Sequence, residues 1–450
     1  MSECPKRALK RYHGFMKGTS QQTHRWQVAW KRVKKLKDHP IAKFGPGLIT
    51  GVADDDPSGV VTYSQAGAQF GLNMLWTMPL AFPLMAAVQS MCALIGRVTG
   101  RGLAANIKEA FPPLILKAVV ILLLVANTLN IAADVAAMGE VGQLVTGINP
   151  RLMTLLFVVV TLLLQVLIPY HRYVFYLKWL TLSLLAYAAV LFTVHVPWHE
   201  VALRTVWPTF TPNAQAATMV VAIFGTTISP YLFFWQASEE VEEMERHQER
   251  GSLLRAPEAA ARELRRIRWD TWSGMFYSDI TAYFIILATA VTLHLAGITD
   301  IQTAAQAATA LRPLAGDSAF LLFTMGLMGV GLIGVPVLAG SAGYALSEAM
   351  GWKWGLERKV RDAQGFYAVI IISVLCALGI QYSPISPMKA LFWSAVINGV
   401  VAVPLMAVII ILASKKSVMG DFTASRPIVI LAWVATGIMA VAALGMLIPG

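Results

Sequence analysis

The stretch TGVADDDPSGVV, residues 50–61, interrupts apolar sequence that is otherwise long enough to cross a membrane. Three consecutive aspartates lie in it and are followed by a proline: Asp54, Asp55, Asp56 and Pro57. One aspartate at the centre of a bilayer costs about 3 kcal/mol on insertion scales, so three of them need a reason. A proline lacks a backbone N–H and clashes with the preceding turn, so we expect the helix to break here.

The composition is typical of an all-α polytopic membrane protein. Of 450 residues, 56% are hydrophobic and 14% are charged, whereas a soluble chain carries about 25% charged residues. About 20 apolar residues are needed to cross the ~30 Å hydrocarbon core, and eleven segments are long enough. They lie at 46–70, 74–96, 114–139, 151–169, 175–197, 217–238, 273–296, 318–348, 366–381, 388–413 and 426–449.

The basic residues alternate along this eleven-span chain as the positive-inside rule requires. All but four of the 36 lysines and arginines fall in the N-terminal segment or in the even-numbered connections. The four exceptions are Arg151, Arg204, Arg312 and Lys389. We therefore expect a cytoplasmic N-terminus in the plasma membrane. The net charge of +11 is explained by topology and contact with the lipid bilayer, and no nucleic-acid partner is expected.

The chain is expected to contain a basic cytoplasmic segment, 1–44, and one transmembrane transport domain, 45–450. The sixth connection is long and mixes acidic with basic residues, which indicates a short helix on the membrane surface around residues 262–268. A monomer is sufficient for this architecture, and the sequence leaves the oligomeric state open.

The sixth span, VVAIFGTTISPYLFFWQASEE at 220–240, is interrupted in the same way as the first. Small polar residues and a proline lie near its middle, among them Thr226, Ser229 and Pro230. Paired mid-membrane breaks five spans apart indicate an inverted five-plus-five repeat with the substrate at the breaks. Asp56 beside freed carbonyls then favours a cation. The alternative is an ordinary proline kink and a small water-filled pocket.

Three stretches resemble a known family. GPGLITGVADDDPSG (45–59), QSMCALIGRVTGRGLAANIKE (89–109) and FGTTISPYLFFWQ (224–236) resemble the first, second and sixth helices of the Nramp family of divalent-metal transporters. The resemblance implies a LeuT-type fold with helices 1 and 6 broken at mid-membrane. It also implies repeat one at 45–200, repeat two at 215–413 and an extra helix at 426–449.

The resemblance also implies a metal site, and this chain departs from the family pattern there. Asp56 stands at the family's metal-binding aspartate, and the Thr226 carbonyl replaces that of an alanine. Gly59 replaces the metal-binding asparagine and Ser229 the metal-binding methionine. Asp55 is a further candidate, in direct or water-mediated contact with the ion. These departures resemble the Nramp-related magnesium transporter branch.

Each departure changes the chemistry expected at the site. A thioether suits manganese, iron and heavier transition metals, and a serine hydroxyl in its place leaves only oxygen ligands. Mg²⁺ is small and hard, keeps several waters and takes one or two carboxylates. We therefore expect alternating-access transport of partly hydrated Mg²⁺, with Mn²⁺ also accepted.

Proton coupling is not expected. Tyr231 and Gln236 stand where the family has histidines, and Ala137 where it has a glutamate, so the residues that titrate near neutral pH are gone. Two alternatives stay open: a proton-coupled Mn²⁺/Fe²⁺ importer, and a transporter of amino acids or other organic solutes on the same fold.

Several further polar residues in or near the spans are weaker candidates. They are Asp54, Gln89, Asp134, Asp279, His294, Glu348 and Asn398. Asp134 is a functional candidate only because an aspartate within a membrane span is energetically costly. His294 is expected at the surface rather than in a metal site. The common hydrolase, zinc-protease and phosphate-loop motifs do not occur, so neither an enzyme nor a cofactor is expected.

Overall fold

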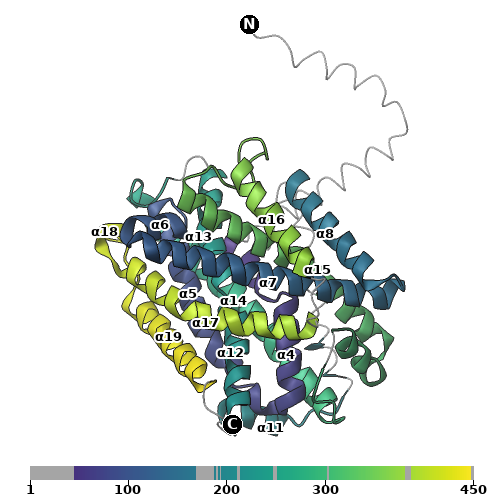
Figure 1. The fold of residues 1–450 in the computed structure, drawn as a ribbon. Helices are drawn as coiled ribbons and strands as arrows, with labels where there is room; N and C mark the ends of the chain where they lie inside the picture. The colour runs from purple at the N-terminus through teal and green to yellow at the C-terminus, as the bar shows by residue number, and fades with distance from the viewer. Residues whose placement is uncertain are drawn as a thin grey trace, which may run out of the picture. The chain divides into compact units, whose positions relative to one another are not determined.

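The computed structural model describes residues 45–168, 187–188, 191–192, 194–209, 213–246, 251–301, 304–380 and 387–446 (Figure 1). Within these ranges the regular structure is helical, and no residue is in a strand. The N-terminal segment 1–44 and most of the fifth predicted span, 175–197, lie outside the described residues and stay predictions.

Helices occupy each of the other predicted spans. They are α3 (Pro46–Asp54) with α4 (Pro57–Phe70), α5 (Thr77–Thr99), α7 (Pro113–Thr146), α8 (Pro150–Leu167), α12 (Ala214–Thr227) with α13 (Pro230–Arg246), α14 (Ala260–Thr289), α15 (Ala304–Met350), α16 (Gln364–Ile380), α17 (Pro387–Ser414) and α19 (Arg426–Gly445). Among the described residues, eight helical stretches are long and apolar enough to cross a membrane. The first span, which contains Asp54, Asp55 and Asp56, is not one of them, and neither is the shorter α16.

Short helices and turns join these spans. They are η2 (Gly71–Met74), α6 (Leu103–Ala110), α11 (Trp198–Val206), η4 (Pro257–Ala259) and α18 (Lys416–Met419). The separate surface helix predicted at 262–268 is wrong, because these residues form the first turns of α14. Glu263 and Asp270 are buried there. Glu263 pairs with Arg97 at 3.6 Å, so the polar sequence joins a buried network instead of lying on a membrane surface.

The first span breaks where the sequence predicts. Pro57 occupies the first position of α4, where a missing N–H is tolerated and the fixed φ suits a helix start. Asp56 is the N-cap residue: its backbone is extended and its carboxylate accepts a hydrogen bond from the Gly59 amide at 2.8 Å. The aspartate therefore ends one half-helix and begins the next.

The sixth span is also broken, and it runs antiparallel to the first. The last regular residue of α12 is Thr227, and α13 begins at Pro230. The N-terminal half-helix α3 packs against α13, whereas α4 packs against α12. In both pairs, the first half of one span packs against the second half of the other. The two spans therefore run in opposite directions, and their breaks face each other.

Backbone-to-backbone packing holds α3 against α14. A Cβ atom at Gly51 would lie 2.1 Å from the Gly274 carbonyl oxygen, and one at Gly274 would lie 2.2 Å from the Gly47 oxygen. Such approach is open only to glycine and is a common way for membrane helices to associate. The half-helix is also bound at its start, because Asp270 accepts a hydrogen bond from the Gly47 amide at 2.7 Å.

The connections that the structure describes lie at two ends of the helical bundle, as the charge alternation predicts. At one end, hydrogen bonds and ion pairs join the start of α3 with the second, sixth and eighth connections. These contacts are Gly47–Asp270, Arg97–Glu263, Leu253–Arg97, Lys108–Ala349 and Arg246–Glu357. At the other end, Gln65 and Asn73 bond to Thr299 and Thr209.

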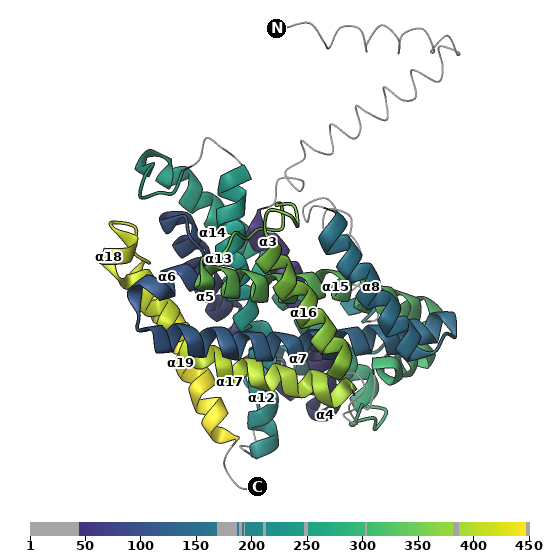
Figure 2. The same ribbon diagram turned by 45° about the horizontal axis from the view of Figure 1, so that its top comes forward.

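Helix α7 and helix α17 pack against each other across the bundle, as both views show (Figures 1 and 2). Helix α7 also packs on α8, α15 and α16, while α19 covers α5, α12 and α17. This arrangement brings polar positions of α7 and α17 to the two breaks.

Candidate functional site

The Asp56 carboxylate is the centre of a hydrogen-bond network at the first break. Its Oδ1 atom accepts from the Ser58 hydroxyl at 2.6 Å and from the Gly59 amide at 2.8 Å. Its Oδ2 atom accepts from the Asn130 amide and from the Tyr231 hydroxyl, both at 3.1 Å. Two elements far away in the sequence, α7 and α13, thus orient this one carboxylate.

The second break supplies oxygen atoms opposite Asp56. The Thr226 hydroxyl lies 3.4 Å from the Ser58 hydroxyl. The Ser229 hydroxyl donates to the Thr226 carbonyl at 2.6 Å and to the Gly225 carbonyl at 2.9 Å. Two of the carbonyls freed by the break are therefore bonded within the break itself, while the Ser229 oxygen keeps lone pairs that can accept or coordinate.

Gly59 lies directly between the two broken helices. A Cβ atom at this position would lie 3.2 Å from the Thr226 hydroxyl, 3.3 Å from the Asp54 carbonyl oxygen and 3.4 Å from the Tyr63 ring. A longer side chain would therefore enter the space between α4 and α12. The predicted residues Asp56, Gly59, Thr226 and Ser229 thus come together around the two breaks.

Asp55, the fifth predicted site residue, is turned to another helix. Its Oδ1 atom accepts from the Ser278 hydroxyl of α14 at 3.0 Å, and the same hydroxyl lies 2.6 Å from Asp54 Oδ2. Adjacent residues on a helix point about 100° apart, which is why the three aspartates do not share one partner set. Asp54 and Asp55 thus share Ser278 of α14 as a partner, and of the three aspartates only Asp56 bonds to a residue of the sixth span.

Asp134 is a further carboxylate close to Asp56. A Cβ atom on Gly334 of α15 would lie 3.0 Å from Asp56 Cβ and 4.0 Å from Asp134 Oδ2, so both side chains border this glycine. Asp134 is fully buried near the Ser58 backbone, yet neither of its carboxylate oxygens makes a hydrogen bond of normal geometry among the described residues. Such a carboxylate lacks the partners that normally offset burial.

Polar residues of α7 and α17 complete the site, and the sequence analysis missed two of them. Asn130 and Asp134 are four residues apart on α7, as are Ser394 and Asn398 on α17, so each pair lies on one helix face. The Ser394 hydroxyl donates to the side-chain amide oxygen Oδ1 of Asn130 at 2.7 Å. Asn130 and Ser394 could have been recognised in the sequence, because each lies four residues before another polar residue within an apolar span.

The positions where family histidines and a glutamate were expected have other roles. Tyr231 bonds to Asp56 and also donates to the Ala53 carbonyl at 3.1 Å, which joins the end of α3 to α13. Gln236 accepts a hydrogen bond from the Thr50 hydroxyl. Ala137 is fully buried on α7.

The remaining candidates make no hydrogen bond to Asp56 among the described residues. Glu348 accepts from the Ser238 hydroxyl at 2.9 Å and ties α15 to α13. His294 is only partly buried and bonds through Nδ1 to the Ala68 carbonyl at 2.8 Å. Gln89, Asp279 and Asn398 are buried, and each has at least one oxygen or nitrogen without a hydrogen-bond partner among the described residues.

This donor set determines which metal ions the breaks can hold. Asp56 supplies one carboxylate at the first break, and Thr226 and Ser229 supply hydroxyl and carbonyl oxygens at the second. No group of three or more histidine, cysteine, aspartate or glutamate side chains in the described ranges is arranged to hold a metal ion. An ion bound at the breaks would therefore rely on neutral oxygens and retained water, a pattern that suits hard cations.

Comparisons with known proteins agree with this architecture. The family model "Natural resistance-associated macrophage protein-like" (Nramp) matches residues 47–449. The divalent metal cation transporter MntH of Klebsiella pneumoniae (strain 342) is 25% identical over 421 residues, which are 91% of this chain and 94% of the relative. The MntH of Acidiphilium cryptum (strain JF-5) is 26% identical over 436 residues, covering 90% and 88% of the two chains.

Solved structures share the fold. A crystal structure of the Eremococcus coleocola manganese transporter, in complex with an aromatic bis-isothiourea substituted compound, has a TM-score of 0.70 at 18% identity and covers 89% of this chain and 85% of that chain. MhsT in complex with L-phenylalanine has a TM-score of 0.58 at 11% identity, with coverage of 89% and 98%. The family match over nearly the whole chain, together with the broken first and sixth spans, shows that this chain belongs to the Nramp family and has its LeuT-type fold.

Proposed function

We propose that the protein transports divalent metal cations across a membrane, with Mg²⁺ as its main substrate and Mn²⁺ also accepted. The relatives are named as divalent metal cation transporters, which supports the general function. The observation that carries the magnesium proposal is the set of oxygen donors at the two breaks, namely the Asp56 carboxylate on one side and the oxygens of Thr226 and Ser229 on the other.

The proposed binding mode follows from the ligand chemistry. Asp56 contacts the ion directly, and the Thr226 carbonyl and Ser229 hydroxyl complete part of its coordination once their mutual hydrogen bond opens. Asp55 acts from a distance, on the side that faces α14. The remaining positions are filled by water, because Mg²⁺ dehydrates reluctantly and one carboxylate is enough to hold it.

Transport is proposed to proceed by alternating access without proton coupling. Tyr231 bonds to Asp56, and tyrosine does not titrate between pH 6 and 8. Movement down the membrane potential supplies the driving force, roughly 4–5 kcal/mol per 100 mV for a divalent ion. The basic residues at the end where α3 starts favour a cytoplasmic N-terminus in the plasma membrane, with α4 leading to the outer side.

One observation favours the alternative of a proton-coupled Mn²⁺/Fe²⁺ importer. Asp134 is a second buried carboxylate beside Asp56, and neither of its oxygens makes a hydrogen bond of normal geometry among the described residues, so it could carry a proton. A transporter of organic solutes is less favoured, because such sites bind a substrate carboxylate at half-helix N-termini and do not need a midplane acid. The enzyme class remains excluded, since the relatives are transporters.

The proposed function is tested with purified protein in liposomes. Flux of Mg²⁺, Mn²⁺ and Ca²⁺ is followed in parallel under an imposed negative-inside potential, while a lumenal dye reports pH. We expect Mg²⁺ and Mn²⁺ uptake at constant lumenal pH. Uptake of Mn²⁺ alone, with acidification, would favour the proton-coupled importer instead.

A further inference from the structure

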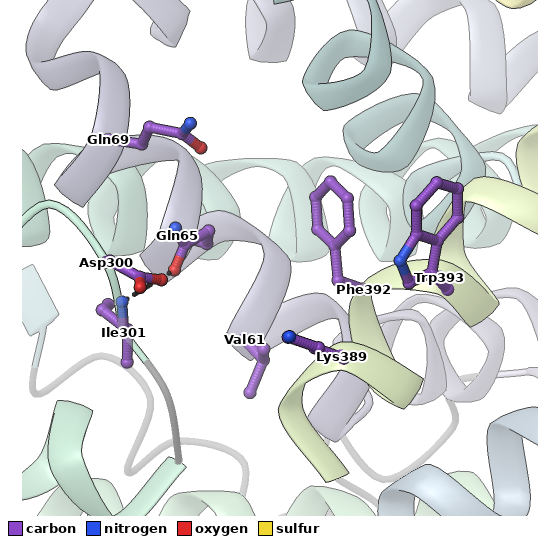
Figure 3. A pocket seen from close by; sticks show the side chains of 8 residues that line it. All are labelled: Val61, Gln65, Gln69, Asp300, Ile301, Lys389, Phe392 and Trp393. Carbon is purple, nitrogen blue, oxygen red and sulfur yellow. Dashed lines mark hydrogen bonds between the residues drawn. The ribbon is translucent and has the colours of Figure 1, made fainter. Parts of the chain in front are cut away.

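A pocket of about 160 Å³ lies at the end of the bundle opposite to the start of α3. One wall is α4, another is the segment that precedes α15, and the third is the beginning of α17 (Figure 3). Gln65 joins the first two walls, because it accepts from the Ile301 amide and donates to the Thr299 carbonyl, both at 3.3 Å.

Two of the walls lead from this pocket to Asp56. Val61 and Gln65 line it and are four residues apart, so they share one face of α4 with Pro57. Val61 is five residues beyond Asp56, about 7.5 Å along the helix axis. Along α17, Ser394 lies five residues beyond the pocket residue Lys389 and is linked to Asp56 through Asn130. Both helices therefore run from the lining of this pocket toward the ion site.

The lining of this pocket carries two charges of opposite sign. Lys389 is exposed in the first turn of α17, and in Figure 3 its amine points toward Val61. Asp300 lies across the pocket, on the same side as Gln65. A lysine is an unexpected residue here, because it repels any cation that enters, and Lys389 is one of only four basic residues on this side of the predicted topology.

We propose that Lys389 offsets the charge of Asp300 in the approach to Asp56 and so limits how readily divalent cations are captured. This inference rests on the proposed ion site and topology. A fixed charge in a cleft acts on an ion in proportion to the charge of that ion, and low-dielectric walls focus its field. Lys389 and Asp300 act on the ion while it is still hydrated. The pair therefore affects the capture of Mg²⁺, Mn²⁺ and Ca²⁺ equally and does not set selectivity among them.

The test is initial-rate Mg²⁺ and Mn²⁺ uptake by cells that express the full chain, in a medium of about 0.02 M ionic strength. Lys389→Gln is expected to lower the half-saturation concentration of both ions about two- to tenfold, and Asp300→Asn to raise it by a similar factor. The double variant returns toward the wild-type value, and Lys389→Arg stays at it. Arg151→Gln, an exposed charge on α8 that does not line the pocket, is the matched control.

Salt dependence separates an electrostatic effect from a packing effect. Raising the ionic strength to about 0.5 M should reduce every shift to less than about twofold, since the Debye length falls below 5 Å. A shift that persists in salt, differs between Mg²⁺ and Mn²⁺, or has the same sign in the Lys389 and Asp300 variants would overturn the proposal. Flux that survives Asp56→Asn rejects the ion site instead, so the two failures are distinguishable.

Discussion

Replacing Asp56 with asparagine removes the charge at the first break and keeps the size of the side chain. The asparagine oxygen can retain the hydrogen bonds from Ser58 and Gly59, and asparagine is as good an N-cap as aspartate. Its amide takes the place of Oδ2 and faces Asn130 and Tyr231, so the two bonds at that atom are lost or weakened.

The expected effects on stability and on binding differ in size. Two lost hydrogen bonds at about 1 kcal/mol each lower the free energy of unfolding by about 2 kcal/mol. Losing the charged partner of a desolvated cation costs about 2–5 kcal/mol, which corresponds to about 30- to 4,000-fold in affinity. Asp56→Ala would add the loss of the N-cap, about 0.5–2 kcal/mol, and is the less selective test.

Two measurements on the same preparation check this prediction. Mg²⁺ flux into liposomes should fall to background in Asp56→Asn, while thermal unfolding in detergent still shows one cooperative transition. Asp421→Asn, an exposed aspartate that follows α18, makes the same chemical change outside the site and should leave both unchanged. Wild-type flux through Asp56→Asn would refute the assignment of the ion site to the breaks.

Three further variants probe the two breaks and the packing of α3 on α14. Gly59→Asn combined with Ser229→Met should weaken the competition of Mg²⁺ against Mn²⁺ transport, since a thioether does not repay the dehydration of Mg²⁺; equal competition in both proteins would place selectivity elsewhere. Tyr231→Phe should reduce Mg²⁺ flux without making it pH-dependent, and unchanged flux would show that its bond to Asp56 is dispensable. Gly51→Ala should lower thermal stability by about 1–3 kcal/mol through overpacking on α14, and an unchanged melting curve would contradict the close contact.

The broken helices could be predicted from the sequence because their cause is local. Pro57 and Pro230 each remove a backbone donor, and Asp56 immediately before Pro57 has the residue type that caps a helix start. The positions of the membrane helices could be predicted because the apolar segments are long enough to cross a membrane. The pairing of the two breaks needed only their spacing of five spans, which the antiparallel contacts of α3 with α13 and α4 with α12 match.

The partners of the aspartates could not be predicted in this way. Whether Asp55 faces the ion or Ser278 depends on how α14 packs against α3, and that contact is set by glycines 223 residues apart. Asn130 reaches Asp56 from α7 for the same kind of non-local reason. The start of α14 was misplaced because a hydropathy pattern does not show that charged residues such as Glu263 pair inside the protein.

The central claim is that this protein carries Mg²⁺ without moving protons. The most direct measurement follows Mg²⁺ entry and lumenal pH together in liposomes under a negative-inside potential, at external pH values from 6 to 8. We predict Mg²⁺ entry that varies little over this range and leaves the lumenal pH unchanged, because Tyr231 and Gln236 stand where the family pattern has titrating histidines. Stoichiometric acidification of the lumen during Mg²⁺ entry, or Mn²⁺ entry with none of Mg²⁺, would contradict it.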